Sequence, residues 1–181
     1  MTIFLIILAV MAGVVILLLL TALLTRRDYA VERNITIYRP AAEVFEYVRH
    51  LKNMEDYNKW VMADPIAVKE YRGTDGSEGF VYAWNSKQKQ AGAGEQLITK
   101  IVHGKRMDIQ ITFFRPFAGI ANSYLETEAI SPVQTSVRWG FASKMSYPMN
   151  AMLIFMNMGE ILGKDLDLSL ENLKLILEDN K

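Results

Sequence analysis

The chain has 181 residues, of which 51% are hydrophobic and 10% aromatic, and its 20 basic and 20 acidic side chains leave no formal net charge. This length suits one ordinary domain with an appendage, and the composition excludes a disordered or collagen-like chain. Zero net charge argues against nucleic acid as a partner, because nucleic-acid-binding domains carry a basic excess. The sequence has no cysteine, which excludes disulfides, thiol nucleophiles and thiolate metal sites.

The first segment is an uninterrupted apolar run of 22 residues, from Ile3 to Leu24. At a rise of ~1.5 Å per residue such a helix is about 33 Å long, enough to cross the hydrocarbon core of a bilayer. A cleavable signal peptide is the main alternative, but it would have a basic start and a shorter apolar stretch. We therefore expect residues 1–27 to form a transmembrane anchor (span 3–24) with a short linker, which makes the lipid bilayer the first expected partner.

Two arginines, Arg26 and Arg27, directly follow the span, and no Lys or Arg precedes it. The positive-inside tendency then predicts a single-pass protein of the cell membrane whose C-terminal domain is cytoplasmic. About five residues separate the span from the first strand, expected near Tyr29, and they reach ~17 Å when fully extended. The domain is therefore expected to sit close to the membrane surface.

Residues 28–181 are expected to form one domain, since they contain no internal repeat or low-complexity tract. The pattern predicts a strand over 29–38, an amphipathic helix over 41–51 and a short helical segment after it. Alternating patterns and turn clusters then predict antiparallel strands at 66–71, 80–84, 95–102, 106–114, 119–130 and 134–142. A long helix with a 3.6-residue apolar period, opened by Pro148, follows them. The predicted class is α+β, with a curved antiparallel sheet around the long C-terminal helix.

Several local sequences share the pattern of one known family. They are Ile35–Val48, where a strand and a proline turn enter a helix with Val44 and Phe45; then Trp60; Gly79, Tyr82 and Trp84; Gly94; Phe114–Pro116; Thr135–Trp139; and Leu168–Lys174, where Ser169 stands in a usual glycine place. In this order they resemble the START-like superfamily, also called SRPBCC, which includes the polyketide cyclase/dehydrase and lipid-transport group and the birch pollen allergen fold. The resemblance covers 28–181 and implies a helix-grip fold with an apolar cavity between sheet and long helix. It implies no single reaction, because the fold hosts both binders and enzymes.

Apolar side chains at alternating positions of neighbouring strands are the candidate lining of that cavity. They are Phe80, Tyr82, Trp84, Ile109, Ile111, Phe113, Trp139 and Phe141. Ordinary core packing is the alternative for each of them. Tyr82, Trp84 and Trp139 are the stronger candidates, because each combines an apolar body with one polar hydrogen that can orient a ligand.

Five of the ten methionines fall between Met145 and Met158. Methionine is flexible and suits surfaces that accommodate varied apolar shapes. We expect Met152 and Met156, on the early turns of the long helix, to complete the cavity wall. Packing in an irregular core and contact with the bilayer or a partner protein are the alternatives.

The sequence shows no catalytic constellation. His50 and His103 are expected at a helix end and in a hairpin turn, both solvated. The acidic residues Asp75, Glu78 and Glu95 need not converge, and acid–base work requires convergence and a shifted pKa. No metal-ligand spacing appears, so we predict neither a metal nor another cofactor.

The favoured function is a non-enzymatic, membrane-anchored module that binds a lipid, quinone-like or polyketide-like molecule in the cavity. One alternative is a cyclase- or dehydratase-type enzyme acting on an apolar substrate, and another is an adaptor for a second membrane protein. A cavity without titratable side chains would count against the enzyme. A cavity filled by the protein's own side chains would favour the adaptor.

Overall fold

The computed structural model describes residues 2–88 and 91–179. A helix, α1 (Thr2–Leu24), precedes a domain in which a strand and short helices are followed by six strands and a long helix. The strands are β1 (Asp28–Ile37), β2 (Val68–Arg72), β3 (Val81–Asn85), β4 (Ala93–Val102), β5 (Arg106–Arg115), β6 (Gly119–Ser131) and β7 (Gln134–Lys144). The helices of the domain are α2 (Ala41–Val48), η1 (Leu51–Asn53), α3 (Met54–Tyr57), α4 (Lys59–Met62), η2 (Met149–Ile154) and α5 (Met158–Asp179).

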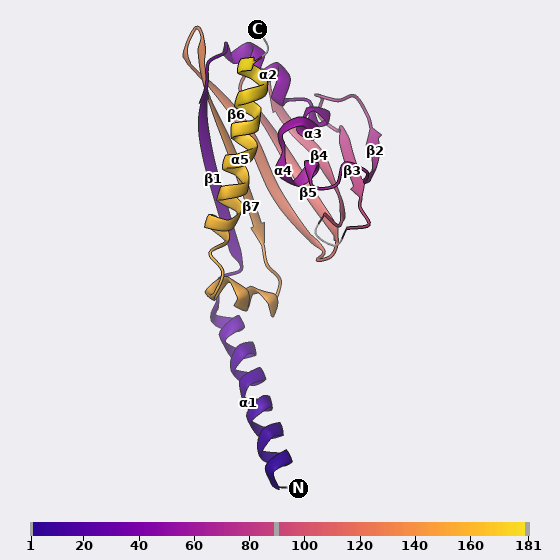
Figure 1. The fold of residues 1–181 in the computed structure, drawn as a ribbon, viewed down its shortest axis with the longest axis vertical. Helices are drawn as coiled ribbons and strands as arrows, with labels where there is room; N and C mark the ends of the chain where they lie inside the picture. The colour runs from indigo at the N-terminus through magenta and orange to yellow at the C-terminus, as the bar shows by residue number, and fades with distance from the viewer. Residues whose placement is uncertain (1, 89–90, 180–181) are drawn as a thin grey trace.

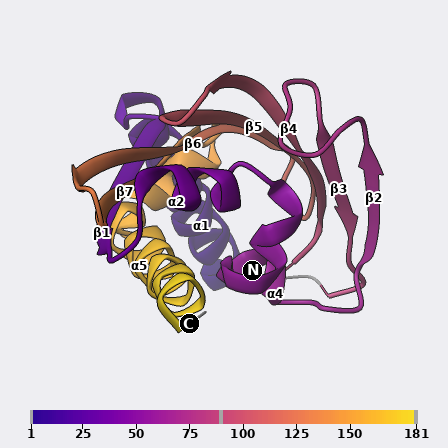
Figure 2. The same ribbon diagram turned by 90° about the horizontal axis from the view of Figure 1, so that it is seen from above.

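The strands form one antiparallel sheet in the order β1-β7-β6-β5-β4-β3-β2. Seen from above, the sheet curls around the short helices on one side and α5 on the other (Figure 2). Because β1 pairs along its whole length with β7, the first strand closes the sheet beside the last one. This is the α+β helix-grip architecture that the sequence predicts.

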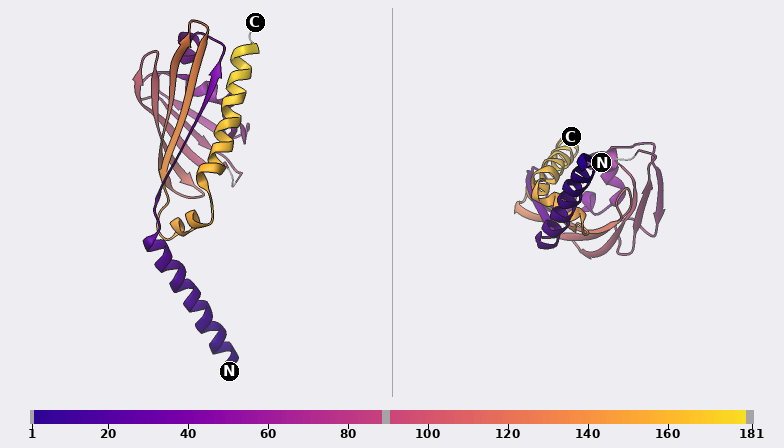
Figure 3. Two further views of the ribbon diagram at one scale, coloured as in Figure 1. Left: turned by 90° about the vertical axis from the view of Figure 1, so that its left-hand side faces the viewer. Right: turned by 90° about the horizontal axis from the view of Figure 1, so that it is seen from below.

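The N-terminal helix α1 extends away from the domain as a separate rod (Figures 1 and 3). It is long and apolar enough to cross a membrane, and Ala22 is its one buried residue among those described. Only residues 25–27 separate α1 from β1, where the sequence predicted about five. The linker is shorter because the sheet extends toward α1, with the Met145 amide donating to the Arg27 carbonyl at 2.9 Å.

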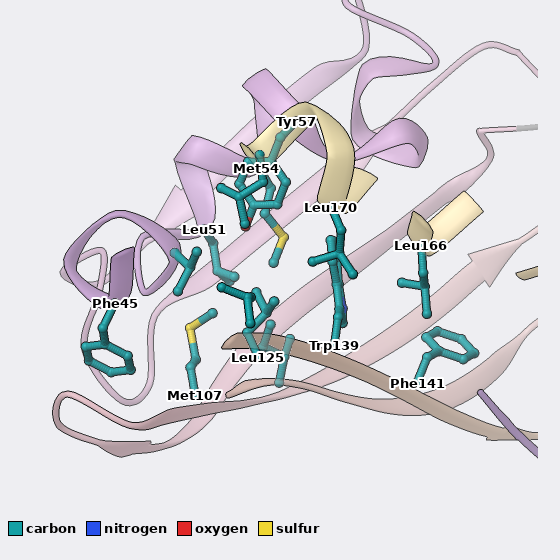
Figure 4. Packing of buried hydrophobic residues seen from close by; sticks show 14 of the residues in the cluster. Phe45, Leu51, Met54, Tyr57, Met107, Leu125, Trp139, Phe141, Leu166 and Leu170 are labelled. Carbon is teal, nitrogen blue, oxygen red and sulfur yellow. The ribbon is translucent and has the colours of Figure 1, made fainter. Parts of the chain in front are cut away.

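The hydrophobic core fills the end of the domain far from α1. Leu166 and Leu170 of α5 point across the interior toward Phe141 and Trp139 of β7 (Figure 4). Tyr57 of α3 meets Trp139 edge-on, with ring centroids 5.9 Å apart. The other fully buried members at this end include Leu51, Met54, Met107, Leu125 and Leu173. These side chains fill the interior between the sheet and α5 at this end of the domain.

The C-terminal helix is shorter than the sequence predicted. The 3-10 segment η2 ends at Ile154, and α5 begins only at Met158. Asn157 caps the new helix, since its Oδ1 accepts a hydrogen bond from the Glu160 amide at 3.2 Å. The backbone amides in the first turn of a helix have no partner within the helix, and a capping side chain supplies one. The cap at Asn157 therefore marks the start of a new helix, and the helix that was predicted to run continuously from Pro148 is interrupted. The prediction that Met152 and Met156 lie on the long helix is therefore wrong.

The segment η2 lies against the end of α1. Asn150 is completely buried there, and its Nδ2 donates to the carbonyls of Ala22 at 2.6 Å and Thr25 at 3.1 Å. The carbonyls in the last turn of a helix lack intrahelical partners, so this side chain acts as a cap supplied from a distant part of the chain. The bond fixes η2 next to the point where the apolar helix ends.

Candidate functional site: a ligand cavity

A cavity of about 560 Å³ lies between the concave face of the sheet, α4 and the start of α5. This volume falls within the roughly 300–1,000 Å³ that is typical of small-molecule sites. Its principal lining residues are Tyr29, Asn58, Lys59, Trp60, Asp64, Lys69, Tyr82, Trp84, Gln96, Ile109, Ile111, Phe113, Phe117, Ser123, Trp139, Phe141, Leu162 and Asp165. The space is not filled by the protein's own side chains, which removes the main reason to favour a pure adaptor.

The cavity occupies the end of the sheet at which β1 begins, which we call the anchor end. Tyr29, the second residue of β1, pairs with Ser143, and Ser143 pairs with Ala121 near the start of β6. The pairs further across the sheet at this end are Gly119–Phe113, Phe113–Gly94 and Gly94–Trp84. Tyr29, Trp84 and Phe113 all line the cavity, so the cavity lies in the half of the domain that is nearer to α1.

Two aromatic pairs shape the cavity walls. Trp84 meets Phe113 edge-on with centroids 6.1 Å apart, and Trp60 faces Phe141 at 6.4 Å. Gly94 makes the first arrangement possible, because a Cβ at this position would lie 2.6 Å from the Trp84 ring and 2.5 Å from the Thr112 carbonyl oxygen. Only a residue without a side chain lets the indole lie against β4.

The indole N–H groups are already satisfied by the protein. Trp84 Nε1 donates to the Ala91 carbonyl at 2.9 Å, and Trp139 Nε1 donates to Ser123 Oγ at 3.0 Å. Ser123 Oγ donates in turn to the Gly140 carbonyl at 2.8 Å. The expectation that these polar hydrogens orient a ligand is therefore corrected: the tryptophans offer apolar faces, and their hydrogen bonds hold the rings in place.

Gln96 is a buried polar side chain of the cavity wall whose amide faces no protein partner. It lies on β4 between Tyr82 and Ile111 in the sheet register, lines the cavity and is only 6% exposed. Within the described residues, its side-chain amide makes no hydrogen bond. Its amide atoms are not among the completely buried side-chain atoms that lack a partner, so the amide is available to a polar atom supplied from the cavity.

Charged groups border the cavity on the helix side. Lys59 forms an ion pair with Asp165 of α5, and the Trp60 indole donates to the same carboxylate at 3.1 Å. Asp64 accepts a hydrogen bond from the Ser86 hydroxyl, and both residues are buried. Two carboxylates that the sequence analysis did not single out therefore line the cavity. Each carboxylate is, however, neutralised or hydrogen-bonded by a neighbour, as buried charge requires.

A second charged cluster lies where α3 faces β2 and β3. Glu55 receives Lys69 Nζ at 2.5 Å and the Tyr71 hydroxyl at 2.6 Å. Burial of Glu55 opposes its ionisation, but these hydrogen bonds outweigh it and hold the pKa of the carboxyl below its usual value. Burial raises the pKa of Tyr82, and the negative charge of Glu55 raises it further. Tyr82 is therefore a neutral phenol over the physiological pH range.

Most of the residues predicted from sequence come together in this cavity. Those that line it are Tyr82, Trp84, Ile109, Ile111, Phe113, Trp139 and Phe141. Phe80 does not line it: the ring is 1% exposed and stacks on Tyr71 with centroids 6.5 Å apart. Met152 and Met156 also lie outside the lining, because they belong to the segment beside α1 rather than to α5.

The sequence analysis missed the helical wall and Gln96. Trp60 and Lys59 sit on α4, a single turn begun by Asn58, whose Oδ1 accepts the amides of Trp60 at 2.9 Å and Val61 at 3.3 Å. An asparagine cap is a recognisable signal of that turn. Gln96 also carries a signal, since it alternates with Gly94 and Ile98 on the inward face of a strand, where a polar residue is unusual.

The remaining polar candidates have structural roles. Asp75 accepts the amides of Leu51 and Gly76, both at 2.9 Å, and Glu78 accepts the Ile101 amide at 2.8 Å. His50 is less solvated than expected, because its ring lies between Glu46 at 3.3 Å and Asp75 at 3.6 Å. His103 lies exposed in the β4–β5 turn, as expected. In residues 2–88 and 91–179, no three histidine or acidic side chains gather as a metal site.

The curved sheet, the C-terminal helix and the cavity between them define the START-like, or SRPBCC, helix-grip fold. In structure the chain is similar to Ara h 8.0201, with a TM-score of 0.57 and 14% identity over 84% of this chain and 99% of that chain. It is also similar to norcoclaurine synthase from Thalictrum flavum in complex with dopamine and hydroxybenzaldehyde, with a TM-score of 0.61 and 8% identity over 87% of this chain and 91% of that chain. A third similar structure is the Aha1 dimer from Colwellia psychrerythraea, with a TM-score of 0.56 and 14% identity over 84% of this chain and 98% of that chain.

No protein-family model and no curated protein matches the sequence. At these low identities the structural likeness establishes the fold alone. One fold can carry many functions, so the function has to be argued from the cavity.

Proposed function

We propose that this protein is a membrane-anchored binder of an apolar molecule that carries one hydrogen-bonding polar group. The observation that supports this most is the cavity of about 560 Å³, whose aromatic and aliphatic walls surround the unpartnered amide of Gln96. Apolar walls with one or a few fixed polar groups are the usual composition of a small-molecule site. The walls provide affinity, and the amide provides orientation.

The chemistry of Gln96 narrows the ligand class. A glutamine amide is both a donor and an acceptor, so it pairs with a carbonyl or a hydroxyl group. Lipids, quinone-like molecules and polyketide-like molecules all carry such a group on an apolar body. The neighbouring charges of Lys59 and Lys69 are already paired with Asp165 and Glu55. A charged group on a ligand would therefore have to pair with Arg115, which also lines the cavity and donates to the neutral oxygens of Asn85 and Ser86.

The apolar helix α1 supports a role at a membrane. Its length and composition fit a membrane anchor, and Arg26 and Arg27 follow it directly. These arginines favour an orientation with the domain in the cytoplasm. Apolar ligands concentrate in bilayers, so a tethered domain with an apolar cavity would be placed next to its ligand.

An enzyme acting on a bound apolar substrate is the second candidate. The observation in its favour is that Lys69 lines the cavity beside Glu55, with the neutral phenol of Tyr82 next to them. An amine, a carboxylate and a phenol in one place are groups that general acid–base catalysis uses. One structurally similar protein, norcoclaurine synthase, is an enzyme, but that activity belongs to that protein.

Binding can be measured by intrinsic fluorescence, because all three tryptophans of the chain, Trp60, Trp84 and Trp139, line the cavity. We expect quinones or long-chain lipids, titrated into the detergent-solubilised full chain, to change this emission. Trp84→Ala should weaken binding by ~1–3 kcal/mol, roughly 5- to 150-fold, through loss of buried aromatic area. Trp60 and Trp139 remain as reporters in that variant.

Gln96→Leu tests the polar contact separately. Loss of one hydrogen bond should weaken a carbonyl-bearing ligand by about 0.5–1.5 kcal/mol, while an alkane of matched length should bind as well or better. His103→Ala is the matched control, since that side chain is exposed in a turn outside the cavity. Equal affinity of wild type and Trp84→Ala would refute the cavity as the binding site. Turnover of a ligand that Lys69→Met abolishes would establish the enzyme instead.

A further inference from the structure

The cavity reaches the surface at the connection between β5 and β6. Phe117 lies in this connection, lines the cavity and is 70% exposed. The opposite end of the interior is closed by the packed core around Leu170 and Tyr57. Figure 1 shows the β5–β6 connection at the same end of the domain as η2 and the junction with α1. One accessible part of the cavity is therefore on the anchor end, and the exposed residues Lys59 and Ala63 border the cavity beside α4.

Large apolar side chains are exposed at this end of the domain, both around the β5–β6 connection and around η2. We call these side chains the anchor-end apolar surface. They are Phe117 and Ile120 from the β5–β6 connection and the start of β6, and Met152, Ile154 and Phe155 from η2 and the turn after it. Phe155 is 78% exposed, the most of any aromatic side chain in the domain segments that the structure describes. Exposed apolar groups that gather on one side of a protein mark a surface that another apolar phase covers.

The chain itself indicates what covers this surface. Only residues 25–27 separate the apolar helix from the sheet, and three extended residues reach no more than about 11 Å. The two hydrogen bonds from Asn150 hold η2 against the last turn of α1. A bilayer that contains α1 thus begins where η2 lies. Arg26 and Arg27 are exposed at the same level, where basic side chains contact lipid headgroups.

We propose that the anchor-end apolar surface rests in the headgroup region of the bilayer that holds α1, so that the cavity opens toward the membrane. Ligand then passes between the bilayer and the cavity beside Phe117 without crossing bulk water. The membrane contact stands on the geometry of α1 and η2 alone, whereas the passage of ligand rests on the proposed binding function.

The membrane contact is tested with single cysteines, which the native sequence lacks. Full-length Phe117→Cys, Ile120→Cys and Phe155→Cys are labelled with an environment-sensitive fluorophore in phosphatidylcholine vesicles, with or without phosphatidylglycerol. Val133→Cys is the matched control, because Val133 is 62% exposed at the opposite end of the sheet, between β6 and β7. We expect doxyl lipids to quench the three probes at the anchor end, and aqueous iodide to quench only the control. Ile120→Cys retains both phenylalanines, so a loss of membrane contact caused by the substitution itself is detected.

Two results would overturn the membrane contact. Equal iodide quenching at positions 117, 120, 155 and 133 would place the surface in water. Shielding of the three probes from both iodide and doxyl lipids would identify a protein partner or a second copy as the cover. Neither measurement involves a ligand, so failure of the proposed binding function would not affect it.

The passage of ligand is tested with Phe155→Asp, a residue outside the cavity lining. We expect transfer of a fluorescent long-chain quinone from vesicles to the protein to become several-fold slower, while its affinity in detergent stays unchanged. Val133→Asp should leave both quantities unchanged. Unchanged transfer by Phe155→Asp would overturn a route through the membrane-side opening, and absence of quinone binding in wild type would instead count against the proposed function.

Discussion

At the scale of single residues, the cavity depends on side chains whose polar atoms are bonded away from it. The N–H groups of Trp84, Trp139 and Trp60 donate to Ala91, Ser123 and Asp165. The carboxylate of Glu55 accepts hydrogen bonds from Lys69 and Tyr71. Gln96 alone among the deeply buried lining residues breaks this rule within the described chain. A sequence shows that a tryptophan lies on an inward face, but the partner of its N–H lies on another strand and is found only in three dimensions.

Glu55 gives a prediction about pH. Its pKa in the folded protein is lower than the usual value of 4.5, so its ion pair with Lys69 stabilises the fold above that value and is lost as the pH falls through the lowered pKa. Glu55→Gln should therefore lower Tm at pH 7, and the difference from wild type should shrink as the pH falls below 4.5 and through the lowered pKa of Glu55. Thermal melts of both proteins between neutral and acidic pH measure this. Glu43→Gln, an exposed residue of α2, should show no such trend, and a constant difference at Glu55 would contradict the ion pair.

At the scale of elements, alternating apolar patterns and turn clusters predicted every strand to within a few residues. Every strand except β2 has buried residues on one face, and β2, which has none, is followed by a turn cluster. The C-terminal helix was predicted too long because apolar residues also occur throughout η2. In η2 these side chains lie outside the domain core. Periodicity reports that a face is apolar, but it does not distinguish a core from the surface beside α1. The capping residue Asn157, with Glu160 three positions later, was the local signal of the break.

Asn157 provides the test at this scale. Asn157→Ala removes the acceptor for the Glu160 amide and should destabilise the domain by about 1 kcal/mol, which corresponds to roughly 2–4 °C in Tm. Asn157→Ser keeps a capping oxygen and should restore most of the stability. If α5 were instead continuous with η2, alanine, the better helix former, would raise Tm, and serine would leave it close to that of wild type.

At the scale of the whole molecule, the helix-grip order was readable from the sequence, since a curved sheet with one apolar face and a single long amphipathic helix have few ways to pack. The position of the cavity was not readable. It follows from how far the large residues of α5 extend: Leu166, Leu170 and Leu173 fill the distal half, whereas Leu162 and Asp165 only border the space. The direction in which the cavity opens follows from β1, which joins the sheet to α1 at the unfilled end.

This arrangement predicts two separable kinds of membrane association. The full chain should stay in the membrane pellet after high-salt and carbonate washing, because α1 buries an apolar length that spans the hydrocarbon core. A chain beginning at Asp28 should be folded and released by carbonate, yet bind vesicles weakly and reversibly through Phe155 and its neighbours. Vesicle flotation at neutral pH, with circular dichroism to confirm folding, measures both.

Phe155→Ser in the shortened chain should abolish flotation, whereas Val133→Ser should not. Carbonate-resistant pelleting of the shortened chain would show that α1 is not the principal anchor, and equal flotation of the two serine variants would show that the residual binding does not use the anchor-end apolar surface.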